Sequence, residues 1–389
     1  MKKRNRTRVL RYIDKPLLFL TIIFSLLGII MVLSASSVTA VLRYGVNPYY
    51  FFIKQILFVF IGYFIGFVII LRIDTYKYKK YIPILLISLA GILLWLILYG
   101  SFTGTAKSWI DLGLFSFQPS EVGKSILIIY MGVFFGDQFN KKPARFSFLI
   151  PLIYAIIIFI LVAMQPDLGT AAIIGGIIFF TFISIPFKKN TAANIAKIGS
   201  GALVCFALVF LFTGNSFLTE EQSSRLDFKE PCVNYTSEIG YQVCNGFIAV
   251  NNGGLFGKGL GNSSQKYLYL PEAHTDFIFP ILVEELGAVV ASIVIIGYLA
   301  ILYRILLIAK KSYNLRNSII CYGTFIYILM HLILNFCGIL ALIPLTGVPV
   351  PFLSYGGTFT INLLLMIFVV LKISSENKIT KEKQEISNI

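Results

Sequence analysis

Residues 270–285 of the chain read LPEAHTDFIFPILVEE, and at this stretch a long polar segment gives way to an apolar run. Asp276 lies on the border, while Glu284 and Glu285 follow inside the apolar run. Asp276 and Glu284 are eight positions apart, so one straight helix would place Glu284 about 12 Å deeper than Asp276. Because ionisable side chains are costly in lipid, carboxylates at such a border are candidates for function.

The rest of the chain has the composition of a membrane protein. Of its 389 residues, 57% are hydrophobic and 13% are charged. Apolar runs of about twenty residues, long enough to cross a bilayer as helices, recur along most of it. We predict an all-α polytopic membrane protein with about ten transmembrane helices. The predicted spans cover residues 16–40, 48–71, 80–100, 120–136, 147–164, 168–187, 191–213, 277–303, 316–343 and 355–372.

Lysine and arginine residues are concentrated in alternate connections between these spans. The net charge is +15, and most of the 33 basic residues fall in segments that the positive-inside rule assigns to the cytoplasm. This distribution places both termini in the cytoplasm and the longest loop, residues 214–276, outside. The charge then reflects topology and contact with anionic lipids, and we expect no nucleic-acid partner.

The sequence divides into a basic cytoplasmic N-terminus (1–15), a membrane domain (16–372) and a polar cytoplasmic tail (373–389). We expect the tail to be disordered. A basic start before an apolar run also fits a cleaved secretory signal. The run from Pro16 to Leu33 is longer than a typical signal core, which favours an uncleaved first span.

The first outer loop, residues 101–119, carries residues suited to an anionic ligand. It contains Lys107 and Trp109, and its end predicts a helix start at Pro119 with Ser120 as the N-cap. The positive end of that helix would attract phosphate. A plainer interpretation of Trp109, as an interfacial belt residue, stays open.

Lys124 would lie about 6 Å below the cap of that helix. It could meet an anionic ligand, or it could form a buried ion pair with Glu284 or Glu285. An unpaired lysine at that depth would be costly.

Two further outer segments are rich in glycine. Residues 253–261 (GGLFGKGLG) fail the Walker pattern, but glycines let the backbone approach a ligand, and Lys258 and Lys266 could meet an anionic one. Loop flexibility is an equal alternative. Residues 344–358 (PLTGVPVPFLSYGGT) cannot form a regular helix, so at membrane depth they must be buried in protein or line a cavity.

Other side chains allow further chemistry. Cys232 and Cys244 lie in the long loop, where a disulfide is allowed, although spacing alone does not establish one. The chain has 2 histidines, His274 and His331, which argues against a histidine-rich zinc site. Asp276 with basic residues nearby suits general-base chemistry beside an anionic leaving group. No cofactor is identified, and a divalent cation is left open.

Taken together, these segments resemble the bacterial SEDS family (shape, elongation, division and sporulation), which includes FtsW and RodA. The motifs appear in the family's order and cover nearly the whole membrane region. They are KSW (107–109), QPSE (118–121), QPDLG (165–169), PEAHTDF (271–277) and GVPVPFLSYGG (347–357).

The resemblance implies a peptidoglycan glycosyltransferase that polymerises lipid II on the outer face of the bacterial cytoplasmic membrane. Family members act with a class B penicillin-binding protein and with other division or elongation proteins. The essential aspartate of the family matches Asp276, its loop tryptophan matches Trp109, and the lysine of its fourth helix matches Lys124. Glu284 and Glu285 then become internal ion-pair partners. The other residues expected to bind substrate are Lys107, Ser120, Lys258, Lys266, Ser354 and Gly356.

The chain departs from the family at a few positions. Many members have arginine before the tryptophan, where this chain has Ser108, with Lys107 one step back. That leaves open which cation, if any, contacts substrate there; the set Lys107, Lys124, Arg225, Lys258 and Lys266 supplies the candidates for the leaving group.

Two other functions stay open. A lipid II flippase predicts a polar path to the cytoplasmic side, and a non-enzymatic division scaffold predicts that Asp276 is replaceable. Residues 245–247 and 279–285 favour an FtsW-like over a RodA-like role, although the main motifs are shared by both.

Overall fold

The computed structural model describes residues 9–99, 108–113, 115–138, 149–165, 167–186, 230–235 and 237–387. Long helices dominate this part of the chain. They are α2 (Lys15–Leu42), α3 (Tyr50–Val68), α4 (Tyr78–Tyr99), α5 (Pro119–Gln138), α6 (Leu149–Ala163), α7 (Leu168–Ile183), α10 (Glu238–Gly253), α11 (Ile278–Lys310), α12 (Leu315–Ile339) and α13 (Gly357–Ser387). Short 3-10 helices, η1 (Ile70–Arg72) and η2 (Thr75–Lys77), join α3 to α4.

The predicted spans correspond to helices because in lipid every backbone polar group must be paired within the chain. Six described segments, which contain α2, α3, α4, α11, α12 and α13, are long and apolar enough to cross a membrane. The helices α5, α6 and α7 coincide with three more predicted spans. The predicted span at 191–213 lies outside the described residues. The chain is an all-α membrane protein with about ten helices.

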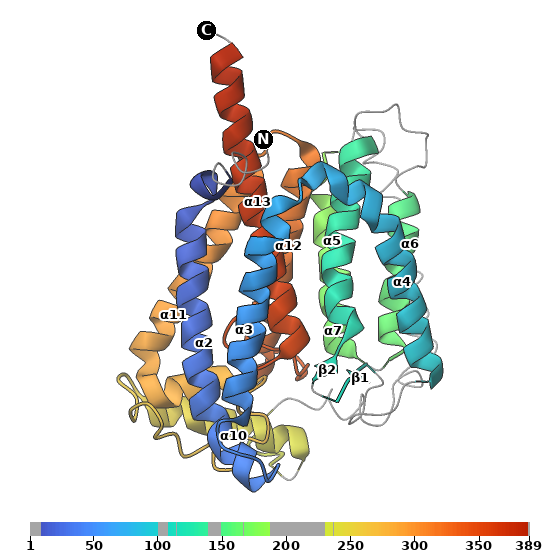
Figure 1. Cartoon of the computed structure of the whole chain (residues 1–389). Helices are drawn as coiled ribbons and strands as arrows, with labels where there is room; N and C mark the ends of the chain where they lie inside the picture. Colours follow the sequence, from blue (N-terminus) through green and yellow to red (C-terminus); the bar gives the residue numbers. More distant parts are fainter. Residues whose placement is uncertain are drawn as a thin grey trace.

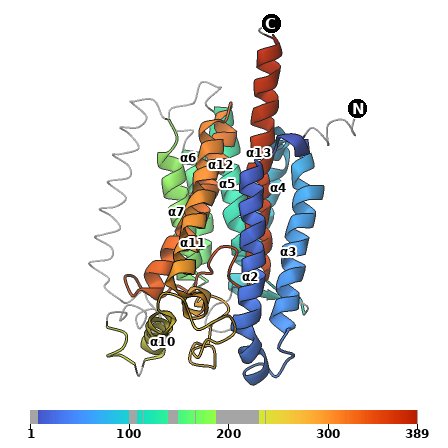
Figure 2. The same cartoon turned by 90° about the vertical axis from the view of Figure 1, so that its left-hand side faces the viewer.

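The bundle is organised around α13, which packs against α3, α5, α11 and α12. In turn α12 packs against α5, α7 and α11, and α2 lies between α3 and α11. Figure 1 shows both chain termini at one end of the bundle and α10 at the opposite end, and Figure 2 shows the same division from the side. We call these the terminal end and the loop end.

The tail is helical, so the expectation of disorder is wrong for the residues up to Ser387. Helix α13 continues beyond the bundle without a break. Its side chains find partners at the terminal end: Ser375 Oγ donates to the carbonyl oxygen of Val9 at 3.1 Å, and Asn377 Nδ2 donates to that of Ile308 at 3.4 Å. The many lysine and glutamate residues of the tail also favour helix.

The outer loops contain regular structure that the sequence did not predict. Helix α10 lies within the long loop, with Ser237 as its N-cap. In the first loop, β1 (Ile110–Asp111) and β2 (Ser116–Phe117) pair antiparallel, with Ile110 opposite Phe117. These elements give the loop end a fixed shape next to the bundle.

Helix α11 is interrupted at Gly287, which has φ 80° and ψ 169°. The backbone of residues 254–259 lies against this break and forms four hydrogen bonds of 2.9 to 3.2 Å with the backbone of residues 284–289. The predicted span that begins at residue 277 is therefore divided at Gly287, and Glu284 belongs to its short first segment. The helix begins only at Ile278, after Asp276, and the glycine-rich run stabilises its interruption.

Replacing Gly287 by alanine is expected to destabilise the protein. The positive φ strains any other residue, typically by about 1–3 kcal/mol. In addition, the new Cβ would lie 2.3 Å from the carbonyl oxygen of Leu255. Thermal unfolding in detergent should show a lower Tm for Gly287→Ala. The matched control is Gly91→Ala in α4, where a Cβ meets nothing within 4 Å; equal Tm values for the two variants would contradict the assigned role of the break.

Candidate active site

Asp276 lies at the loop end, between the long loop and the start of α11, and it is 7% exposed. Its backbone is held by Asn335 of α12. The side-chain amide of Asn335 donates to the carbonyl oxygen of Asp276 at 2.7 Å and to that of Val348 at 2.8 Å. One buried amide therefore ties two irregular segments, residues 270–277 and 344–356, to the helical bundle.

The carboxylate of Asp276 faces the last outer loop. Gly347 has a φ of +64°, and a Cβ at this glycine would lie 3.6 Å from Asp276 Oδ2. On the other side, Thr275 Oγ1 donates to Asp276 Oδ1 at 3.3 Å. Gly347 thus supplies a backbone conformation that other residues rarely adopt and leaves space beside the carboxylate.

The motif Ser354-Tyr355-Gly356 fastens the last outer loop to the segment that carries Asp276. Ser354 is fully buried, and its Oγ donates to the carbonyl oxygen of Thr275 at 2.5 Å. The backbone N–H of Tyr355 donates to the carbonyl oxygen of His274 at 2.9 Å. Gly356 follows directly before α13 and is partly buried. The contacts made by Ser354 are internal to the protein.

Lys124 is fully buried in the bundle and belongs to a polar network. Its Nζ lies 2.7 Å from Glu121 Oε1 and 3.2 Å from His331 Nε2. His331 Nδ1 lies 3.1 Å from the carbonyl oxygen of Pro349, so a neutral imidazole can donate to Pro349 and accept from Lys124. Lys124 thus forms a buried ion pair, one of the two alternatives that the sequence left open, but its partner is neither Glu284 nor Glu285. Glu121, one turn earlier on the same helix, takes that place.

Helix α5 begins at Pro119, so Ser120 lies inside its first turn. The buried Oγ of Ser120 has no hydrogen-bond partner among the described residues. The predicted N-cap role of Ser120 is therefore wrong. Proline suits the first helical position because its missing N–H would be unpaired there in any case.

The described part of the first outer loop places Trp109 directly before β1, where it is partly buried. The preceding Ser108 is buried, and its Oγ donates to the carbonyl oxygen of Gln165 at 3.5 Å. This contact ties the tryptophan segment to the turn between α6 and α7. Lys107 and Arg225, two of the predicted cations, lie outside the described residues.

Lys258 and Lys266 pair with the two glutamates at the start of α11. Lys258 Nζ lies 2.9 Å from Glu284 Oε1, and Lys266 Nζ lies 3.0 Å from Glu285 Oε1. Both glutamates and Lys266 are buried, whereas the Lys258 side chain is about one-third exposed. Each lysine therefore has an internal counter-ion, and neither offers an uncompensated charge to a ligand.

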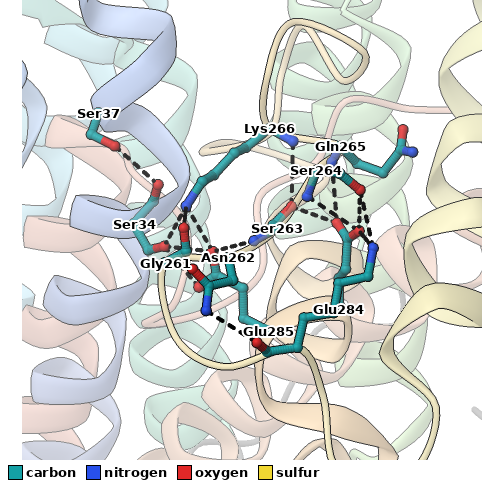
Figure 3. Close-up of polar contacts among 11 residues, drawn as sticks. Ser34, Ser37, Gly261, Asn262, Ser263, Ser264, Gln265, Lys266, Glu284 and Glu285 are labelled. Atoms are coloured by element: carbon teal, nitrogen blue, oxygen red, sulfur yellow. Dashed lines mark hydrogen bonds and ion pairs between the residues drawn. The ribbon is translucent and has the colours of Figure 1, made fainter.

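Serine hydroxyls complete the environment of both carboxylates, as Figure 3 shows. Ser263 Oγ and Ser264 Oγ donate to Glu284 at 2.5 and 2.8 Å. Ser34 of α2 donates to Glu285 Oε1 at 2.6 Å. We call this set of contacts the loop clamp, because it joins residues 258–266 to both α11 and α2.

Cys232 and Cys244, whose pairing the sequence left open, form a disulfide bond across 12 positions. Cys244 is a buried residue of α10. The bond therefore attaches residues 230–235 to that helix and shortens the free length of the long loop.

His274 is buried beside the site and stays neutral at pH 7. Burial, together with the nearby guanidinium of Arg43, lowers the pKa of His274 from 6.5 to about 4. Its ring lies 4.6 Å from the ring of Phe51 and 5.7 Å from that of Tyr355, and its Nδ1 has no hydrogen-bond partner among the described residues. Arg43 itself pairs with Glu272 at 3.2 Å.

The sequence did not identify Asn335 or His331 as residues that support the site. They are four positions apart in an apolar span, so they share one face of a helix. Two polar side chains at helical spacing inside a membrane helix were the signal that could have identified them.

The site supplies one carboxylate, Asp276, in a fixed setting at the loop end. Such a group can accept a proton from a hydroxyl that lies within hydrogen-bond reach. No group of three or more His, Cys, Asp or Glu side chains in the described part of the chain is placed to hold a metal ion.

Comparison with known proteins identifies relatives over almost the full chain. The family model FTSW_RODA_SPOVE, described as cell cycle protein, matches residues 15–379. The chain is 34% identical to the probable peptidoglycan glycosyltransferase FtsW of Bacillus subtilis (strain 168), over 96% of this chain and 95% of the relative. It is 32% identical to stage V sporulation protein E of the same strain, over 93% and 96%.

Solved structures share the fold. A chain of a peptidoglycan synthase complex, described as coordinating polymerization and crosslinking, superposes with a TM-score of 0.72 at 19% identity, covering 94% of this chain and 98% of that one. The crystal structure of the rod shape determining protein RodA of Thermus thermophilus gives a TM-score of 0.65 at 20% identity, covering 94% and 97%.

Removing one partner of the loop clamp should destabilise the protein more than removing both. Lys266→Met leaves Glu285 buried without a counter-ion, which typically costs about 3–5 kcal/mol. The double variant Lys266→Met/Glu285→Leu should recover part of this loss, which a double-mutant cycle of unfolding in detergent measures. The exposed pair Lys381 and Glu385 is the control, where the coupling should be about 0–1 kcal/mol. A cycle with no coupling at Lys266 would refute the clamp.

Acid should weaken the fold through His274. Its pKa is about 4 in the folded protein and 6.5 otherwise, so between these values the unfolded chain binds more protons, and stability falls as pH drops from about 6.5 to about 4. The full effect is up to about 3 kcal/mol. Thermal unfolding across this range should show a shallower pH dependence for His274→Gln than for the unmodified protein. Parallel curves for the two proteins would show that His274 does not titrate as described.

Proposed function

This chain belongs to the FtsW, RodA and SpoVE family of cell cycle proteins and is a peptidoglycan glycosyltransferase, and we propose that it polymerises lipid II with Asp276 as the general base. One observation carries the proposal. Asp276 is held by the Asn335 amide and by the last outer loop at one end of a membrane bundle. A lipid-linked sugar can reach such a site with its lipid tail still in the bilayer.

The proposed reaction is a single displacement. A sugar hydroxyl of one lipid II attacks the anomeric carbon of the lipid-linked growing glycan, and the new glycosidic bond forms as the bond to the pyrophosphate oxygen breaks. The bonding electrons leave with undecaprenyl pyrophosphate. Asp276 accepts the hydroxyl proton. This displacement inverts the anomeric centre.

The other residues of the predicted substrate set receive proposed roles, which for Lys107 follow from the family resemblance alone because it lies outside the described residues. Trp109 is proposed to contact a sugar ring, and Lys107 to meet the pyrophosphate. Lys124 and Ser120, at the start of α5, are proposed to shape the inner wall of the site. The remaining members support the two loops from inside the protein; they are Lys258, Lys266, Ser354 and Gly356.

Lys258 and Lys266 act by position in this proposal, because Glu284 and Glu285 neutralise them. The loop clamp fixes the start of α11, and Asp276 lies two residues before that helix. The carboxylate is thereby set at a defined distance from the bundle, which general-base catalysis requires.

The loop end is proposed to be the outer face, because most basic residues fall at the terminal end and its connections. Both termini are then cytoplasmic, in the bacterial cytoplasmic membrane. A class B penicillin-binding protein is the proposed partner, since a structural relative belongs to a complex that couples polymerization to crosslinking. The FtsW names of several relatives favour a role in division.

The proposed base is tested by Asp276→Asn, which keeps the side-chain volume but removes the proton acceptor. Purified protein should lose about 10²- to 10⁴-fold in the rate of glycan-chain formation from lipid II, measured with and without a partner penicillin-binding protein. The matched control is Glu272→Gln, four positions earlier in the same loop and partly exposed, which should keep most of the rate.

The same assay separates the competing functions. A scaffold would form no glycan as the unmodified protein. A flippase would move lipid II between the leaflets of vesicles. It would form no glycan, either as the unmodified protein or as Asp276→Asn. A normal rate of polymerisation by Asp276→Asn would contradict the general-base role of Asp276, although the protein would still be a transferase.

A further inference from the structure

A cavity of about 960 Å³ opens at the terminal end of the bundle. It lies where the α3–α4 junction, the start of α12 and the emerging part of α13 meet. Figure 1 shows these three segments at the same end of the molecule. The lining combines polar and charged side chains with apolar ones, which include Val9, Leu10, Phe67, Leu71 and Ile379.

Basic side chains outnumber acidic ones around this cavity. The lining includes the carboxylates Asp74 and Glu376 and the cations Arg72, Lys77, Arg316, Lys372 and Lys383. Both carboxylates are engaged by the protein. Asp74 pairs with Lys372 at 2.9 Å, and Glu376 accepts hydrogen bonds from Thr75 Oγ1 at 2.6 Å and from Asn317 Nδ2 at 3.2 Å. The remaining cations therefore give the cavity an excess of positive charge.

Among the cations of the lining, Arg316 has a buried side-chain nitrogen that no described residue satisfies. Its Nε is buried and has no hydrogen-bond partner among the described residues. A buried donor without a partner typically costs about 1–3 kcal/mol, and more when the group is charged. In the described part of the chain, Arg72 and Lys383 also form no salt bridge. A ligand that accepts hydrogen bonds and carries negative charge would satisfy all three.

The hydrogen-bond donors and the positive charge of these groups favour phosphate as the ligand. A guanidinium presents a planar set of donors that matches phosphate oxygens. Arg316 is the second residue of α12, whose N-terminus contributes partial positive charge to the same place, and Asn314 caps that helix. The apolar side chains of the same lining suit the glycerol and upper acyl chains of a phospholipid.

We propose that this cavity binds a phosphate group, with Arg316 as its main donor and with Arg72 and Lys383 as supporting cations. The phosphate can be the headgroup of an anionic phospholipid or free phosphate. The site is independent of the glycosyltransferase centre, because it lies at the opposite end of the bundle and uses none of its residues.

The test uses the full-length protein in detergent, with lipid binding measured by native mass spectrometry. The probes are phosphatidylglycerol, a monogalactosyl diacylglycerol with the same acyl chains and no phosphate, and inorganic phosphate. The unmodified protein should bind phosphatidylglycerol about tenfold or more tightly than the galactolipid. Arg316→Gln should remove most of this preference, a loss of about tenfold or more for a charge-assisted contact. Inorganic phosphate that displaces the phospholipid would identify free phosphate as a ligand of the same site.

The matched control removes equal charge from the same end of the molecule without touching the cavity. Lys310→Gln/Lys311→Gln should bind phosphatidylglycerol within about twofold of the unmodified protein, whereas Arg72→Gln/Lys383→Gln should bind it several-fold more weakly, as the loss of two phosphate contacts requires. Arg72 and Lys383 are exposed, so this pair stays informative if Arg316→Gln fails to fold. Equal losses in the two double variants, or equal affinity for the galactolipid, would overturn the proposal.

Discussion

The two hydrogen bonds from the side-chain amide of Asn335 are the interaction on which the loop end depends. They reach the carbonyl oxygens of Asp276 and Val348, which belong to two segments without regular structure. Irregular backbone next to a membrane bundle needs partners from the protein, because lipid supplies none. A single side chain on a rigid helix satisfies both segments, so the carboxylate of Asp276 is carried by the bundle rather than by a free loop.

Three lysine side chains, Lys124, Lys258 and Lys266, are likewise paired within the protein. Lys124 has Glu121, Lys258 has Glu284 and Lys266 has Glu285, all at 2.7 to 3.0 Å. Buried ion pairs add little net stability but are costly to break, so they specify which segments lie together. Here the pairs of Lys258 and Lys266 join the long loop to the start of α11, whereas Lys124 and Glu121 pair within α5. Glu284 and Glu285 are thus engaged by internal pairing, which agrees with the proposal that Asp276 carries the chemistry at this border.

The sequence predicted the spans well and the contacts poorly, for a physical reason. Apolar runs are local signals, so the helices could be predicted. Pairing partners such as Lys124 and His331, which are 207 positions apart, leave no periodic trace in the sequence. The break at Gly287 could not be predicted for the same reason. A glycine inside an apolar run is compatible with a continuous helix, and only the contact with the distant glycine-rich run reveals the interruption. The N-cap prediction for Ser120 was wrong for a local reason, because Pro119 occupies the first helical position.

The close packing of α12 on α5 restricts movement of the terminal end of the bundle relative to the loop end. A Cβ at Gly132 or Gly136 of α5 would lie 2.4 Å or 2.5 Å from side-chain atoms of Ile320 and Arg316 of α12, and one at Gly323 would lie 2.7 Å from Ile128 of α5. Such close contact leaves the helices little freedom to slide, because packed interfaces do not deform continuously. Helix α12 carries Arg316 at the terminal end and Asn335 near the loop end, about 28 Å apart along the helix. We therefore expect a ligand at the terminal cavity to anchor the bundle without changing the geometry around Asp276.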